Sequence, residues 1–384
     1  LPVQVDSLRV LGRSHAPSTP CVVYGRSPAR PGLPQEVRFV VPHATDSLLR
    51  GAASITAHVP GASRMLEAPV FPQALRPFVA ADFPVRAEAN VRTFPFLHVD
   101  EVARTITTAP GSWTVDRDLV VPAGYVWRAA APLQLELRPG VRIISRSPLL
   151  WTGSEDLPIR ITGLPGTGSG LLVLDAEGRS RMDQVHCSGL SGALGAETSA
   201  GVIFQRSAVS LERSTFTGDR GGLVHIALCE GTVRNCMFTG GKDQLRLRFT
   251  KAQVSGTRFE NAADDAVIVE GGGASLALCM VVSAGSVGLK ADLAARVEIT
   301  GSSIEARGTG IEAEQAAALR MQGGSLDAPR AAHAGKAEMR YGAVRIELKE
   351  VDCRQGCEAM KAGKGSALIV DGKAVQAPSK AADE

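Results

Sequence analysis

The sequence predicts an all-β protein whose main body is a right-handed parallel β-helix. In the second half of the chain an apolar residue recurs at steps of 22, 21, 22, 23 and 22 residues. Within each repeat, short runs with apolar residues at alternate positions are separated by Gly, Asn, Asp or Ser, a pattern of strands and turns. The recurring residues are Phe216, Phe238, Phe259, Val281, Ile304 and Leu326. Because so short a repeat cannot bury its apolar face alone, successive coils must stack into a core.

A period of about 22 residues suits a coil of three strands, with neighbouring coils about 4.8 Å apart. A β-sandwich also has short strands at regular intervals, but it does not require whole units to recur. Two further columns are expected to point inward from one strand of each coil. The first contains Val202, Val224, Leu245, Val267, Leu289 and Ile311, and the second contains Phe204, Ile226, Leu247, Val269, Ala291 and Ala313.

Residues 1–95 differ from the repeat, since proline is frequent and strand-like runs occur at 35–44 and 53–62. We interpret this part as a β-rich N-terminal region in the form of a small sandwich. The β-helix is predicted over 96–372, with its opening coils capping the exposed end. A Gly/Ala/Ser-rich insertion at 188–200 is expected to leave a coil as a loop, and residues 373–384 to form a disordered tail.

Composition excludes several function classes. The formal net charge is only +3 and the basic residues are dispersed, so a nucleic-acid partner is not expected. No stretch of 18 apolar residues is present, so no membrane-spanning segment is expected. The first residues do not resemble a signal peptide, which leaves open whether one has been removed. Nothing in the sequence indicates the oligomeric state.

The chain has seven cysteines. Cys236 and Cys279 fall in one column but two coils apart, which is too far for a disulfide. Cys353 and Cys357 are close enough in sequence to bridge across a turn. Their spacing does not match a zinc site, because no companion Cys or His pair is near.

Several segments resemble a known family. They are "VPAGY", "RSPL", "SRMDQVHCSGLSG" and "GSALIVDGK", spread over residues 95–375. They are similar to the right-handed β-helix module of bacterial envelope proteins that is found beside spore-coat protein H-like kinase domains. The resemblance implies a β-helix associated with carbohydrate binding and sugar hydrolysis, with Asp-rich turns in the middle coils. Asp243, Asp264 and Asp265 stand in such turns, whereas Arg246, Arg248 and Ile268 occupy positions where acids are expected.

Alternation also defines the outward side of the strand that carries the two inward columns. Its charged residues come from different coils yet are expected to lie about 4.8 Å apart. One outward row contains Ile203, His225, Arg246, Ile268, Lys290 and Glu312, and the other contains Gln205, Ala227, Arg248, Glu270, Asp292 and Glu314. The plain interpretation is a solvated face with interspersed ion pairs.

The functional interpretation is a polysaccharide groove. His225, Arg246 and Lys290 are the candidate catalytic residues, as base or as partners of an anionic sugar. Arg248, Glu270, Asp292 and Glu312 are candidate substrate-binding residues. Asp243, Asp264 and Asp265 offer oxygen ligands for a divalent cation such as Ca²⁺, the only cofactor that the sequence suggests. Asp264 and Asp265 also raise the alternative of a hydrolase with paired carboxylates.

The sequence therefore predicts an exported protein of the periplasm, cell surface or extracellular space that binds an anionic or neutral polysaccharide. Whether it also cleaves the polymer, as a lyase or a glycoside hydrolase, is left open. The alternative is a structural, adhesion or protein-interaction scaffold with a degenerate site.

Overall fold

The computed structural model describes residues 2–10, 13–18, 20–24, 39, 41, 53–60, 65–70, 88–192, 200–219, 221–337 and 342–375. The chain divides into two compact units, Leu1–Arg86 and Ala87–Glu384. Most of the predicted insertion at 188–200, most of the predicted tail at 373–384 and most of the predicted strand at 35–44 lie outside the described residues.

The N-terminal unit contains one antiparallel sheet among its described residues, in the order β2-β1-β4-β5 with β3 also paired to β1. Its strands are β1 (Pro2–Val10), β2 (Arg13–His15), β3 (Cys21–Tyr24), β4 (Ala53–His58) and β5 (Met65–Val70). Val5, Val10 and Ala57 are buried. This is the β-rich region that the sequence predicts, although a second layer of a sandwich is not seen in the described part.

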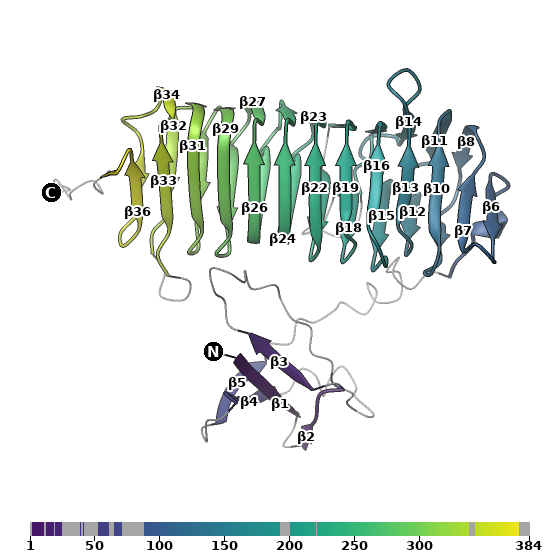
Figure 1. Ribbon diagram of the computed structural model, residues 1–384, viewed down its shortest axis with the longest axis horizontal. Helices are drawn as coiled ribbons and strands as arrows, with labels where there is room; N and C mark the ends of the chain where they lie inside the picture. The colour runs from purple at the N-terminus through teal and green to yellow at the C-terminus, as the bar shows by residue number, and fades with distance from the viewer. Residues whose placement is uncertain are drawn as a thin grey trace. The chain divides into compact units, whose positions relative to one another are not determined.

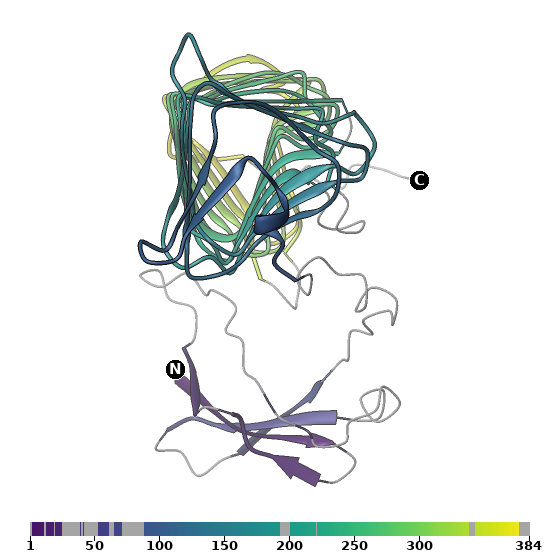
Figure 2. The same ribbon diagram turned by 90° about the vertical axis from the view of Figure 1, so that its right-hand side faces the viewer.

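The second unit is the predicted right-handed parallel β-helix, built as one continuous 32-stranded sheet (Figure 1). Seen along its axis, the coils superimpose as a three-sided outline (Figure 2). Each strand pairs with the corresponding strand of the coils before and after it. We name the three sides face A, face B and face C.

Face A carries the strand with the two predicted inward columns. It consists of β9 (Leu119–Val121), β12 (Arg142–Ser145), β15 (Gly170–Leu174), β18 (Ala200–Gln205), β21 (Gly222–Ala227), the first parts of β24 (Leu245–Ser255) and β26 (Val267–Ala277), β28 (Val287–Asp292), β30 (Thr309–Ala313), β32 (Arg330–Ala334) and β35 (Lys361–Ala362).

Face B follows face A in each coil. It consists of β7 (Thr105–Thr108), β10 (Val126–Ala130), β13 (Leu149–Thr152), β16 (Ser180–Asp183), β19 (Val209–Glu212), β22 (Glu230–Arg234), the second parts of β24 and β26, the first parts of β29 (Arg296–Ala306) and β31 (Ala318–Asp327), β33 (Arg345–Lys349) and β36 (Ala367–Val370).

Face C completes the coil. It consists of β8 (Gly111–Val115), β11 (Leu133–Leu137), β14 (Ile159–Thr162), β17 (Val185–Ser188), β20 (Thr215–Gly218), β23 (Met237–Gly240), β25 (Arg258–Glu260), β27 (Met280–Ala284), the second parts of β29 and β31, and β34 (Asp352–Gln355).

The register confirms the predicted inward columns. Val202 pairs with Val224, which pairs with Leu245, and the same alignment continues to Ile311. In the column that defines the repeat, the rings of Phe216 and Phe238 stack at 5.0 Å between centroids, and those of Phe238 and Phe259 at 4.9 Å. These side chains are almost completely buried. Stacked rings add to the free energy gained by removing their apolar area from water.

The corner between faces B and C is turned by a residue with positive φ followed by a small polar one. Asn235 and Gly256 have φ values of 50° and 56° in successive coils. A Cβ on Gly256 would lie 2.4 Å from Asn235 Oδ1, so the Asn235 side chain would have to move to admit one. The following residues form a buried corner column: Ser214, Cys236, Thr257, Cys279 and Ser302.

Members of the corner column accept hydrogen bonds from backbone N–H groups that the turn leaves without a carbonyl partner. The Thr257 hydroxyl donates to the carbonyl of Ser255 at 3.0 Å and accepts from the N–H of Cys236 at 3.4 Å. Likewise, the Ser302 hydroxyl donates to the carbonyl of Thr300 at 3.1 Å and accepts from the N–H of Cys279 at 3.0 Å. At two positions of this column, Cys236 and Cys279 carry a free thiol where the other members carry a hydroxyl. Burial raises the pKa of the Cys236 thiol to about 12, so it stays protonated.

The first end of the β-helix begins before residue 96. The 3₁₀ turn η2 (Val91–Thr93) is followed by β6 (Leu97–Asp100), which pairs antiparallel with β7. The Asn90 side chain donates to the carbonyl of Asp118 at 2.8 Å and accepts from the N–H of Val120 at 2.8 Å. Val91 and Phe94 are buried in the core. Residues 88–95 thus belong to the solenoid rather than to the N-terminal region.

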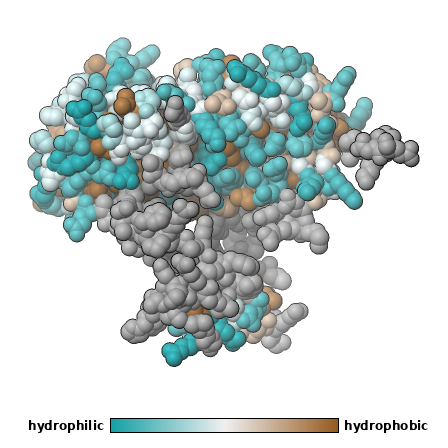
Figure 3. Space-filling model, turned by 180° about the vertical axis from the view of Figure 1, so that it is seen from behind, coloured by the Kyte–Doolittle hydropathy of each residue, from teal (hydrophilic) through white to brown (hydrophobic). Residues whose placement is uncertain are grey.

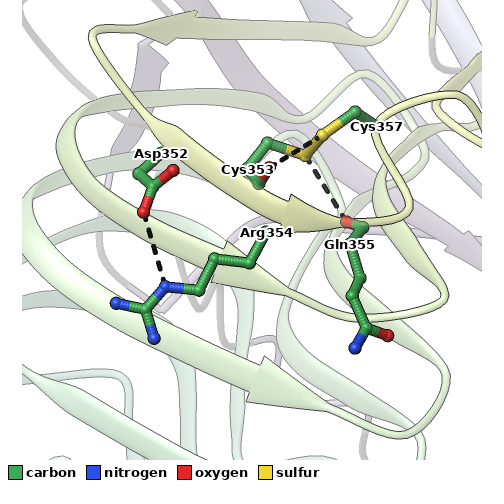
Figure 4. Close-up of a disulfide and its surroundings, with 5 residues drawn as sticks. All are labelled: Asp352, Cys353, Arg354, Gln355 and Cys357. Atoms are coloured by element: carbon green, nitrogen blue, oxygen red, sulfur yellow. Dashed lines mark hydrogen bonds and ion pairs between the residues drawn. A yellow bond between two sulfur atoms is a disulfide. The ribbon is translucent and has the colours of Figure 1, made fainter.

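The last coils carry a disulfide between Cys353 and Cys357, with an S–S distance of 2.06 Å, next to β34 (Figure 4). After β36 the chain reverses into β37 (Lys373–Ala374), which pairs antiparallel with β36. Residues 373–375 are therefore ordered against the solenoid and do not form part of a disordered tail. The bridge that the cysteine spacing allowed is present.

Candidate functional site

One outward row runs along face A through ten coils in register. Its members are Val120, Ile144, Leu172, Ile203, His225, Arg246, Ile268, Lys290, Glu312 and His333. The first four are apolar and at most 2% exposed. From Arg246 onward the row is mainly charged. The described surface of the solenoid is otherwise mostly hydrophilic in the view of Figure 3, with scattered hydrophobic residues.

The charged strip is defined here as the outward residues of face A, and of the turns leading into it, from Lys242 to Glu314. Its members are Lys242, Asp243, Arg246, Arg248, Asp264, Asp265, Glu270, Lys290, Asp292, Glu312 and Glu314. Ile203 and Ile268 face outward as predicted, but both are buried, at 1% and 4% exposure. The predicted outward row is therefore only partly a solvated surface.

Each cation of the strip pairs with a carboxylate. Arg246 Nη2 lies 3.2 Å from Asp243 Oδ2, and Arg248 Nε lies 3.6 Å from Glu270 Oε2. Lys242 Nζ lies 3.6 Å from Asp264 Oδ2. The Asp243 and Glu270 side chains are only 15% and 20% exposed, so these two pairs are less screened than ordinary surface pairs.

Lys290 is surrounded by acids. Its Nζ lies 3.3 Å from Glu312 Oε1 and 3.5 Å from Glu314 Oε2. Although burial by itself lowers the pKa of Lys290, the charges of Glu312, Glu314 and Asp265 outweigh it, so the pKa is raised. Glu312 is also 3.4 Å from Nδ1 of His333 in the next coil. Lys290 therefore holds its proton, which makes it a poor general base.

Three aspartates stand in the turns that lead into β24 and β26. Burial, followed by the charges of Asp264 and Asp243, raises the pKa of Asp265 to about 6. Its Oδ1 accepts a hydrogen bond from the N–H of Val287 at 3.1 Å. Burial also raises the pKa of Asp243, against the opposing charge of Arg246. Asp265 thus carries its proton in part of the molecules near neutral pH, as a general acid must.

His225 lies at the start of the strip, beside Arg246 in register. It is 4% exposed, and burial together with the charges of Arg246 and Arg248 lowers its pKa to about 4. Its Nε2 is buried without a hydrogen-bond partner. His225 is therefore neutral above that pH, but it is a weak base, and its environment differs from that of a solvated surface histidine.

The structure brings the predicted site residues together on one face. The candidate catalytic residues His225, Arg246 and Lys290 occupy one row, and the substrate-binding candidates Arg248, Glu270, Asp292 and Glu312 lie in that row and the next. Among the residues that the structure describes, no group of three His, Cys, Asp or Glu side chains is arranged to hold a metal ion. The prediction that Asp243, Asp264 and Asp265 bind Ca²⁺ gains no support from this geometry.

A second feature, a cavity on face C, was not predicted from the sequence. A cavity of about 160 Å³ opens on face C near the first coils, where the loop between β13 and β14 projects from the solenoid (Figure 1). Ser112, Gln134, Asp156 and Arg160 line it. Its side chains come from three coils and one loop, and only the strand register, which the sequence does not show directly, places them together.

No protein-family model matches the chain, and no curated protein matches it. Among solved structures, the periplasmic alginate epimerase AlgG is similar at 10% identity and a TM-score of 0.41, over 73% of this chain and 80% of that one. The catalytic domain of a GH87 α-1,3-glucanase in complex with nigerose is similar at 10% identity and a TM-score of 0.36, over 96% and 86%. A variant of that domain in complex with tetrasaccharides has 11% identity and a TM-score of 0.40, over the same shares. At these TM-scores the similarities bear on neither the site nor its chemistry, and none involves a spore-coat protein H-like kinase.

Proposed function

We propose that face A binds an extended polysaccharide along the charged strip. The main support for this proposal is that one outward row changes from apolar to charged along face A, while the inward columns of the same strands stay apolar. The inward columns keep the same apolar character through both halves, so the stacking of coils does not explain this change. Side chains repeated about every 4.8 Å offer a sugar chain one hydrogen-bonding position after another.

Buried polar atoms without hydrogen-bond partners also support ligand binding at the charged strip. Of the seven buried side-chain nitrogen and oxygen atoms without a hydrogen-bond partner among the described residues, His225 Nε2, Arg246 Nε and Glu270 Oε2 lie in or beside the strip, the last of them 3.6 Å from Arg248 Nε. Buried polar groups in native proteins nearly always have partners, so such a concentration marks a position where a polar ligand is expected.

The disulfide supports an exported protein of the periplasm, cell surface or extracellular space. Bridges such as Cys353–Cys357 persist in oxidising compartments and are rare in the cytosol. No helix in the described part of the chain is long and apolar enough to cross a membrane.

The binding test is a pair of double variants. Removing both guanidinium groups with Arg246→Ala and Arg248→Ala should weaken glycan binding at least about tenfold, because hydrogen bonds from these groups to sugar hydroxyls would be lost and a hydrogen bond to a charged group contributes about 1.5–3 kcal/mol. The matched control is Arg296→Ala with Arg320→Ala, which removes two exposed guanidinium groups from face B. If both double variants bind every polysaccharide as the wild type does, the proposal is wrong.

Hydrolysis is the second candidate function, and the raised pKa of Asp265 favours it. A carboxylic acid that keeps its proton to about pH 6 can protonate a glycosidic oxygen, while a neighbouring carboxylate activates water. Asp264 and Asp243 are the neighbours whose charges act on Asp265. A lyase is less favoured, because Arg246 and Lys290 are both ion-paired with carboxylates and the pKa of Lys290 is raised.

The measurement for hydrolysis is the release of reducing ends from polysaccharides. Asp265→Asn should abolish release, and in the wild type the rate should fall as the pH rises above about 6. Asp327→Asn, on face C, is the control and should leave the rate unchanged. Binding without any release in the wild type would leave a lectin-like role.

A further inference from the structure

We propose that the polysaccharide held on face A is cationic, a glycan with free amino groups whose ammonium ions lie among Asp265, Asp292 and Glu314. This inference rests on the proposed binding function of the same strip and adds the charge of the ligand. It replaces the anionic glycan that the paired arginines suggested from sequence.

The first observation is the balance of charge. The strip holds three more carboxylates than cationic side chains. Its acids are Asp243, Asp264, Asp265, Glu270, Asp292, Glu312 and Glu314, and its cations are Lys242, Arg246, Arg248 and Lys290. A uronate or sulfate on the ligand would therefore enter a region that already has an excess of negative charge.

The second observation is that the cations of the strip already form ion pairs. All four are within 4 Å of a carboxylate of the strip, so none is held ready for an anionic ligand. By contrast, Asp265 and Asp292 have no ion pair in the described part of the chain. Each accepts one backbone N–H, from Val287 at 3.1 Å and Leu293 at 2.7 Å. A carboxylate offers about four lone-pair positions, so both can accept further donors.

The excess is concentrated around Lys290, which has four acids of the strip near it. Asp265, Glu312 and Glu314 all act on its charge, and Asp292 lies beside it in the second row. Burial, together with the charges of Glu314 and Glu270, raises the pKa of Asp292. Carboxylates that repel one another in this way are stabilised by another cation. An ammonium is a compact cation with three donors, which carboxylates from adjacent coils can accept together.

His225 provides an independent indication of a polar ligand at the other end of the strip. It is 4% exposed, its Nε2 has no hydrogen-bond partner, and it is uncharged near neutral pH. A neutral imidazole donates to or accepts from a sugar hydroxyl without adding charge. An extended chain on face A would thus meet the neutral His225, beside Arg246 and Arg248, at one end and the excess of acids at the other, which suits a polyhydroxylated chain bearing ammonium groups better than a bare metal ion. The described residues contain no preformed metal group either.

The test is calorimetric binding of the full chain to glucosamine oligomers at pH 6.5. N-acetylated glucosamine oligomers, galacturonate oligomers and a lysine oligomer, all of the same length, are the comparisons. The free-amine oligomer should bind at least about tenfold more tightly than each, and more weakly as salt rises. Asp292→Asn should remove most of that preference, while Asp327→Asn on face C should not.

The outcomes separate the two proposals. Equal binding of free and acetylated oligomers would overturn the cationic ligand but leave polysaccharide binding intact. Binding of no glycan at all would overturn both. A lysine oligomer that binds as tightly as the amino sugar would reduce the effect to non-specific attraction. Tight binding of Ca²⁺ alone, lost in Asp292→Asn, would show that the acids serve a metal, and would also overturn the inference.

Discussion

The two halves of face A share one backbone and one register but differ in their outward side chains. Val120, Ile144, Leu172 and Ile203 form a buried apolar row outside the solenoid core. In the following coils the row continues as Arg246, Lys290 and Glu312, partly exposed and ion-paired. Inward residues are apolar in both halves. The inner side of the coil is therefore apolar throughout, whereas the outer side differs between the two halves.

Placing a charge in the apolar half should have the largest effect. Leu172→Lys would put an ammonium in a side-chain position that is 0% exposed, with no acid in its row neighbours Ile144 and Ile203. A buried unpaired charge costs several kcal/mol. Denaturant unfolding should show a loss of about 3–5 kcal/mol in the free energy of unfolding. A loss below about 1 kcal/mol would mean that this row is accessible to water.

Truncating the isoleucine of each half should have a smaller and unequal effect. Ile203→Ala leaves a cavity among apolar neighbours and should cost about 2–5 kcal/mol of unfolding free energy. Ile268→Ala lies between Arg246 and Lys290, whose flexible side chains can fill the space. It should therefore cost less than Ile203→Ala in the same denaturation experiment. The reverse order would contradict the distinction between the halves.

Asp265 should make the stability of the charged half depend on pH. Its pKa is raised in the folded protein from the ordinary value of 3.8 to about 6, so the folded state binds the proton more tightly than the unfolded state. The stabilisation is therefore complete below about pH 4 and is lost as the pH rises to about 6. Compared with wild type, Asp265→Asn should show a smaller decline of melting temperature across this window. If the melting temperatures of wild type and Asp265→Asn declined equally, a group other than Asp265 would be responsible for the pH dependence.

The smallest effect should come from the edge of the strip. Lys242 and Asp264 form a pair whose side chains are 61% and 42% exposed. Exposed pairs contribute at most about 1 kcal/mol. Lys242→Ala should therefore change the unfolding free energy by less than about 1 kcal/mol, as measured by urea denaturation. A larger loss would show that the pair is part of a more tightly coupled network than its exposure indicates.

The inward half of the fold was predictable because alternation and a constant period act together. Counting from Phe216 placed Val224 and Leu245 in one column, and the register agrees. The same counting placed Arg246 and Lys290 on the outer side of one face. A slip of one residue would turn every apolar residue outward, so the sequence allows little freedom here.

The burial of the outer row was not predicted, although the sequence contained a sign of it. Runs such as Leu171–Leu174 are apolar at consecutive positions, which is typical of strands buried on both sides. The cluster of acids around Lys290 was only partly visible, since ion pairs depend on rotamers as well as on register. The face C cavity depends on a loop whose path no periodicity describes.

The corner column has a consequence for how this chain can change in length. Each hydroxyl or thiol serves the coil before it as well as its own, as Thr257 does for Cys236 and Ser255. Adding or removing one complete coil would bring an equivalent group to the same place, so every neighbour would keep a partner. A single added residue would separate the corner from its carbonyl and reverse the sides of the strand that follows. Growth of this solenoid during evolution is therefore expected in steps of whole coils.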